Sequence, residues 1–170
     1  TKAFSGTVNN NIYVIGGWKD DIVNETFNVS SSWTPNTVIA NSWGEVEKTI
    51  VNLKTPFAAV SDSNGLIYVV GGIDSSGNKT DKVSRYNSNT NSWSAMTSMN
   101  SIREAPATEV VNNKIYAIGG NGTNDSAEIY DINTNQWTNI SASSGNFQNR
   151  KNAFSGVVDN KMYIIGGQEQ

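Results

Sequence analysis

The sequence predicts an all-β protein built from four-stranded antiparallel sheets that follow one another along the chain, and three observations support this. The first is an apolar run that ends in two glycines and occurs four times, at residues 12–17, 67–72, 115–120 and 162–167. The first glycines of these pairs are 55, 48 and 47 residues apart. Repetition at about fifty residues is typical of arrays in which each repeat forms one small sheet.

The second observation is a polar turn in front of each apolar run. Asn112-Asn113-Lys114 separates Val110-Val111 from the third run, and residues 159–161 separate Val157-Val158 from the fourth. Two apolar segments joined by a short Asn-rich turn predict a β-hairpin. Residues 61–65 form a longer turn in the second copy.

The third observation is a second hairpin in each of two repeats. Trp93 follows Tyr86 by seven residues, and Trp137 follows Tyr130 by the same spacing, in both cases across a turn of Asn, Ser and Thr. Each repeat therefore supplies four strands. Residues 115–118 are apolar on both alternating faces, which indicates strands covered on both sides by neighbouring sheets.

The first repeat departs from this pattern in its second half. Phe27 takes the tyrosine position, while Trp33 and Trp43 both compete for the tryptophan position. We favour Trp43, because its distance from the next glycine pair matches those of Trp93 and Trp137. Residues 30–41 are then an enlarged loop.

The glycine pairs, the tyrosine before them and the Tyr–Trp hairpins together resemble the kelch repeat. The resemblance covers essentially the whole chain and implies a kelch-type β-propeller, in which four-stranded blades surround a central channel. The chain is then a single array. Its blades span about residues 1–50, 51–98 and 99–145, with a half-blade at about 146–170.

Three and a half repeats do not close a ring of roughly four to eight blades. The alternatives are a partial ring cut from a longer propeller and a ring closed by oligomerisation. Residues 3–6 return in the same order at 153–156, so the last half-blade would compete with the first half-blade of a second copy. That competition favours the partial ring.

Composition excludes several classes of function. The net charge is −3 without a basic patch, so we expect no nucleic-acid partner. No apolar run approaches the roughly 18 residues of a membrane span and no signal peptide is visible, so we expect no membrane association and leave cytoplasmic and secreted locations open.

The chain contains no histidine and no cysteine. This removes nucleophile–histidine catalysis and the usual zinc ligands, which disfavours an enzyme, although Glu/Arg or Tyr chemistry on a sugar would not need histidine. No cofactor is expected. Acids in or beside the loops after the glycine pairs, among them Asp74, Asp125 and Glu128, could bind a cation or a sugar. The alternative is solvated charges that keep strand edges from pairing.

The resemblance places candidate ligand-binding residues at the mouth of the channel. Arg103 and Arg150 each lie thirteen residues before the repeat tyrosine, and Lys2 and Asn152 lie nearby in the same register. An arginine pair could hold a carboxylate, or each arginine could brace the loop between adjacent blades. Metal ligands are not expected.

Two further residues are candidates on different grounds. Glu109 alternates with apolar residues in an inner strand, where an acid should face channel water or be paired. Trp18 directly follows the first glycine pair and could stack on a sugar, anchor a peptide or cover a blade edge.

These residues favour a non-catalytic binding module whose loops bind a protein or peptide. One alternative is a carbohydrate-binding or sugar-processing protein, and another is a structural segment of a larger repeat protein. Self-association through open blade faces is a further possibility.

Overall fold

A computed structural model describes most of the chain after residue 52 and three strands before it. The described residues are 3–8, 11–16, 25–28, 53–54, 58–87, 89–90, 92–122, 127–140 and 149–169. All of the regular structure in these residues is β-strand. They contain no helix that could cross a membrane.

Two complete four-stranded antiparallel sheets form the centre of the array, in the order β5-β6-β8-β9 and β11-β12-β14-β15. We call them blade 2 and blade 3. Their strands are β5 (Ala58–Ser61), β6 (Leu66–Val70), β8 (Val83–Asn87), β9 (Ser92–Met96), β11 (Ala107–Val111), β12 (Lys114–Ile118), β14 (Ala127–Asp131) and β15 (Gln136–Ile140). The expected blade architecture is confirmed.

Partial sheets flank these two blades. Blade 1 has the order β1-β2-β3, and blade 4 consists of β17 and β18. Their strands are β1 (Ala3–Val8), β2 (Asn11–Gly16), β3 (Glu25–Asn28), β17 (Phe154–Val158) and β18 (Lys161–Ile165). Trp33, Trp43 and the enlarged loop expected in the first repeat lie outside the described residues.

The turns inside the inner hairpins have the chemistry that the sequence predicts. Asn112 and Asn113 have φ angles of 49° and 60°, and Asp159 and Asn160 have φ angles of 49° and 57°. Positive φ at both central residues defines the tight turn that matches strand twist, and Asn and Asp tolerate it. In blade 2, Asp62 Oδ1 instead accepts hydrogen bonds from the backbone N–H groups of Asn64 and Leu66.

The outer hairpins pair each tyrosine directly with its tryptophan. Tyr86 is opposite Trp93 and Tyr130 is opposite Trp137. The ring centroids are 5.3 Å and 5.1 Å apart, within the range of favourable aromatic contact. The seven-residue spacing therefore encodes a cross-strand aromatic pair.

The core between blades 2 and 3 interlocks one face of each sheet. Tyr68, Val70, Val83 and Met99 from the side of blade 2 pack with Ile115, Ala117, Tyr130 and Trp137 of blade 3. Trp137 Nε1 donates to the carbonyl of Thr97, which follows β9, at 3.0 Å. Tyr130 lies so deep in this core that burial raises the pKa of its hydroxyl to about 12. Strands that are apolar on both faces are therefore explained by stacking of blade on blade.

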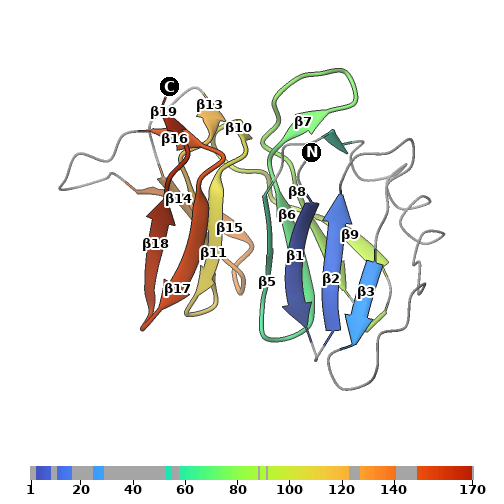
Figure 1. Ribbon diagram of the computed structural model, residues 1–170. Coiled ribbons are helices and arrows are strands. Elements are labelled where there is room, and N and C mark those ends of the chain that lie inside the picture. The colour runs from blue at the N-terminus through green and yellow to red at the C-terminus, as the bar shows by residue number, and fades with distance from the viewer. Residues whose placement is uncertain are drawn as a thin grey trace.

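The innermost strands lie side by side in the order of the chain. β5 contacts both β1 and β11, and β11 contacts β17. Figure 1 shows these strands between the outer strands β18 at one side and β3 at the other. The side chains of β11 that point away from its neighbours therefore border the region where a propeller has its channel.

Blade 4 leaves one apolar face open. Phe154, Tyr163 and Ile165 have exposed fractions of 76%, 48% and 68%. The register equivalents of Tyr163 and Ile165 in blade 2, Tyr68 and Val70, are completely buried under blade 3, and Ala58, the equivalent of Phe154, is also buried. The exposed side chains thus belong to a face that another blade covers elsewhere in the same chain.

The structure adds short ribbons that the sequence did not predict. In three repeats the segment before the inner strand pairs with the segment after the glycine pair. The ribbons are β4 (Leu53–Lys54) with β7 (Ile73–Asp74), β10 (Arg103–Glu104) with β13 (Asn121–Gly122), and β16 (Arg150–Lys151) with β19 (Gln168–Glu169). They lie at one end of the blades, at the top of Figure 1, and we call them the upper ribbons.

Candidate functional site: the upper ribbons

The glycine pairs fix the upper ribbons to the neighbouring blade. Gly72 N donates to the carbonyl of Arg103 at 2.8 Å, and Gly120 N donates to the carbonyl of Arg150 at 3.0 Å. The preceding Gly71 has φ +63°, and a Cβ atom there would lie 2.4 Å from the Arg103 carbonyl oxygen. Only glycine allows this backbone contact between blades.

A sharp bend connects the ribbons of blades 3 and 4 to their inner strands. Ala105 and Asn152 have φ angles of 51° and 57°. The N–H of Asn152 donates to the carbonyl of Ala105 at 3.2 Å, so the bends of blades 3 and 4 are hydrogen-bonded to each other. The left-handed conformation is unfavourable for alanine, and it is maintained here by the surrounding contacts.

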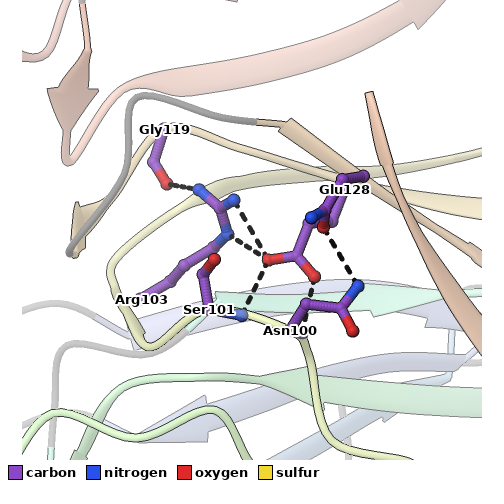
Figure 2. Close-up of polar contacts among 6 residues, drawn as sticks. Asn100, Ser101, Arg103, Gly119 and Glu128 are labelled. Atoms are coloured by element: carbon purple, nitrogen blue, oxygen red, sulfur yellow. Dashed lines mark hydrogen bonds and ion pairs between the residues drawn. The ribbon is translucent and has the colours of Figure 1, made fainter. Parts of the chain in front are cut away.

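Arg103 points into blade 3 and binds Glu128 (Figure 2). Its Nε and NH2 atoms lie 3.1 Å from Glu128 Oε1, and NH1 donates to the carbonyl of Gly119 at 2.7 Å. Glu128 also accepts hydrogen bonds from the backbone N–H groups of Asn100 and Ser101, at 2.7 and 3.2 Å. The ion pair therefore secures the connection that enters blade 3.

Burial determines what this pair can do. The side chains of Arg103 and Glu128 are both 0% exposed. Desolvation lowers the pKa of Arg103, and the Glu128 carboxylate opposes that shift; arginine remains charged at neutral pH. The expectation that Glu128 is a solvated loop acid is wrong, because it lies in β14 and is completely buried. The contacts of Arg103 are those of a bracing residue.

Arg150 repeats part of this arrangement in a more open setting. Its NH1 atom donates to the carbonyl of Gly166 at 3.0 Å, as Arg103 does to Gly119. Arg150 and Asn152 are both half-buried. Of the two arginines predicted at the mouth, the structure therefore leaves Arg150 partly accessible to solvent.

A charged group that the sequence analysis did not identify spans three blades. Glu104 of β10 lies 4.0 Å from Lys79, in the segment after β7, and 4.0 Å from Lys151 of β16. The Glu104 side chain is largely buried, whereas Lys79 and Lys151 are about one-third exposed. We call these three residues the upper charged cluster. The loops that follow the glycine pairs differ in length, so Lys79 has no equivalent position in the other repeats that a sequence comparison could align with it.

The remaining candidate residues are not brought together with this cluster. Glu109 is half-buried in β11 opposite Tyr116. Within the part of the chain that the structure describes, the side chain of Glu109 has neither a hydrogen-bond nor an ion-pair partner. Lys2 and Trp18 lie outside the described residues. The described residues contain no group of three or more side chains that could together bind a metal ion.

The stacked four-stranded sheets with neighbouring inner strands define the class of β-propeller blades. The family model described as the KLHDC2/KLHL20/DRC7 Kelch-repeats domain matches residues 3–170. The chain belongs to the kelch-repeat family.

Several curated proteins are similar to this chain. Kelch-like protein terF of Aspergillus terreus is 29% identical over 95% of this chain and 38% of its own length. Kelch-like protein 38 of Danio rerio is 31% identical over 75% of this chain and 21% of its own length. The human Kelch repeat and BTB domain-containing protein 12 is 27% identical over 95% of this chain and 29% of its own length. The matched region is thus well under half of each relative.

Proteins of the kelch-repeat family commonly mediate protein–protein interactions.

Proposed function

We propose that this chain is a non-catalytic module that binds a protein or peptide at its upper ribbons. The observation that carries the proposal is the upper charged cluster, which draws Lys79, Glu104 and Lys151 from three consecutive blades. Glu104 and Lys151 lie on short strands and Lys79 lies in the segment after β7, at the end of the blades where one ligand can reach several blades at once.

The charges favour a partner segment with an acidic side chain. Glu104 is shared by two lysines, so the cluster has one positive charge in excess. Lys79 and Lys151 are separated from Glu104 by 4.0 Å, a distance at which partly exposed ion pairs contribute little. A carboxylate of the partner can therefore approach both ammonium groups, and the half-buried Arg150 and Asn152 flank Lys151 in the chain.

The proposal predicts that peptides selected from a random library by this chain contain acidic residues. Replacing both lysines, Lys79→Ala and Lys151→Ala, should weaken binding of the selected peptides about tenfold or more, as measured by calorimetry, because two charged contacts are lost. Lys161→Ala, at the opposite end of β18, is the matched control and should leave affinity unchanged.

Equal affinity of the double variant and the parent chain would contradict the proposed site. A glycan array screened in parallel tests the carbohydrate alternative. Glycan binding that is lost in the double lysine variant would replace the peptide by a sugar as the ligand of the same surface.

A second candidate function is self-association, favoured by the open face of blade 4. Phe154, Tyr163 and Ile165 form an exposed apolar face, and such faces in soluble proteins commonly mark interaction sites. We expect light scattering at increasing concentration to show a discrete dimer. A constant monomer mass would contradict this candidate.

A further inference from the structure

Three polar side chains of blade 2 lie on one face of its sheet. Asp62 directly follows β5, and its backbone N–H donates to the carbonyl of Leu66, so Asp62 is opposite Leu66. Tyr68 is opposite Arg85 in the pairing of β6 with β8. Leu66 and Tyr68 are two positions apart on β6. Because side chains alternate along a strand, Asp62, Tyr68 and Arg85 share a face.

This face is the one that blade 3 covers. Tyr68 belongs to the core shared by the two blades, and its ring centroid lies 6.1 Å from that of Tyr130 in β14. Asp62 and Tyr68 are 6% and 0% exposed, and Arg85 is half-buried. We call Asp62, Tyr68 and Arg85 the interblade polar group.

The charges of the interblade polar group are peculiar to blade 2. At the position of Asp62, opposite the residue two places before the repeat tyrosine, the other repeats have valine: Val8, Val111 and Val158. Blade 3 has Ile129 where blade 2 has Arg85. Blade 2 therefore has an acid and a base where blade 3 has two apolar side chains. An isolated buried charge is costly, and an opposite charge on the same face reduces that cost.

One atom of each member has no hydrogen-bond partner among the described residues. These atoms are Asp62 Oδ2, the Tyr68 hydroxyl and Arg85 Nε, and all three are inaccessible to solvent. Asp62 Oδ1, by contrast, accepts from the backbone N–H groups of Asn64 and Leu66. Buried polar atoms in folded proteins are nearly always paired with protein groups or with ordered water.

The three side chains are close enough to influence one another. Burial raises the pKa of the Tyr68 hydroxyl, the Asp62 carboxylate raises it further, and Arg85 lowers it. Arg85 approaches this hydroxyl without the geometry of a hydrogen bond. The acid, the hydroxyl and the guanidinium thus interact without direct hydrogen bonds between the three atoms.

We propose that one internal water molecule binds to the interblade polar group and bridges Asp62 to Arg85. Arg85 Nε and the Tyr68 hydroxyl each donate to the water oxygen, and the water donates to Asp62 Oδ2. Internal waters typically make about three hydrogen bonds, which these atoms supply with two donors and one acceptor. A larger ligand is excluded because none of the three atoms is accessible to solvent.

The water links two charges that the strands keep apart. In a low-dielectric core the hydrogen bonds of such a network strengthen one another, so the acid and the base are stabilised together. The half-buried Arg85 provides the route by which the water exchanges with solvent. The site goes beyond the proposed peptide surface, since none of its three residues belongs to the upper ribbons.

A crystal structure at a resolution that shows ordered waters tests the proposal directly. We expect an electron-density peak within hydrogen-bond distance of Asp62 Oδ2, the Tyr68 hydroxyl and Arg85 Nε. A direct hydrogen bond between any two of these atoms, or the absence of a peak among them, would overturn the proposal.

Oxygen-17 relaxation dispersion tests it in solution, because this measurement counts long-lived internal waters. Asp62→Val combined with Arg85→Ile introduces the residue types that blade 3 has at these positions, and the count should fall by one water. Asp81→Ala with Lys82→Ala is the matched control, because it removes a partly exposed ion pair of the same repeat and should leave the count unchanged. Equal counts in the parent chain and the Val/Ile variant would contradict the proposed water.

A double-mutant cycle tests the bridge with milder changes. Asp62→Asn keeps the Oδ1 atom that accepts from the turn and removes the charge. Asp62→Asn and Arg85→Ile should each raise the equilibrium constant of unfolding about tenfold. The double variant should unfold less readily than the product of these factors, because the water couples the two residues. Independent, multiplicative effects would overturn the bridge.

Discussion

Gly71→Ala is expected to destabilise the chain by about 3–4 kcal/mol, a large effect for a single methyl group. The added Cβ would lie 2.4 Å from the carbonyl oxygen of Arg103 and 3.1 Å from the end of the Met99 side chain. The carbonyl cannot easily retreat, because it accepts the hydrogen bond from Gly72 that joins the two blades. The positive φ adds about 1 kcal/mol of strain. Denaturant unfolding followed by tryptophan fluorescence measures the loss.

Two glycines of the same chain separate these contributions. Gly77 and Gly166 have φ angles of +89° and +71°, and a Cβ at either position meets nothing within 4 Å. Gly77→Ala should therefore cost only about 1 kcal/mol of backbone strain. Gly166→Ala is the closer match, because Gly166 is the same repeat position without a following blade in this structure. Equal losses for Gly71→Ala and Gly166→Ala in the monomeric state would refute the blade-to-blade contact as the cause.

Glu128→Gln should reduce the free energy of unfolding by about 3–5 kcal/mol, because it leaves the guanidinium of Arg103 buried beside a neutral amide. The substitution preserves the shape of the side chain and one acceptor oxygen, but an NH2 group replaces the other oxygen. The loss therefore combines the removed charge with a lost hydrogen-bond acceptor. Chemical denaturation at neutral pH measures it.

Asp131→Asn on the same strand is the matched control. Asp131 lies 3.7 Å from Lys114 in a partly exposed pair, and such pairs contribute about 0.5 kcal/mol. Arg103→Met combined with Glu128→Gln should recover much of the loss, since no buried charge remains. A double variant as unstable as the sum of the two single variants would show that the residues act independently.

The sequence predicted the parts of the fold that depend on local patterns. Hairpins followed from Asn-rich turns, and stacked sheets followed from runs that are apolar on both faces. The cross-strand aromatic pairs followed from the spacing of Tyr130 and Trp137. Each of these features involves residues close together in the chain, and its hydrophobic period is visible without knowledge of tertiary contacts.

The candidate site was less predictable, because the sequence does not show whether a charged side chain is buried or exposed. Arg103 and Arg150 are equivalent by position, yet the first is completely buried and the second is partly exposed. Lys79 lies in the segment after β7, whose length differs between repeats, and only the fold places it 4.0 Å from Glu104 of the next blade. The proposals for Glu109, Lys2 and Trp18 remain predictions.

The sequence by itself determined the repeat, the four strands of blades 2 and 3, and the kelch family. Tertiary structure decided which polar residues stabilise the array and which face the surface. Glu128 illustrates the physical reason. Its partners lie 25 to 28 positions earlier in the chain, and only the stacking of one blade against the next removes water from it and gives it those partners.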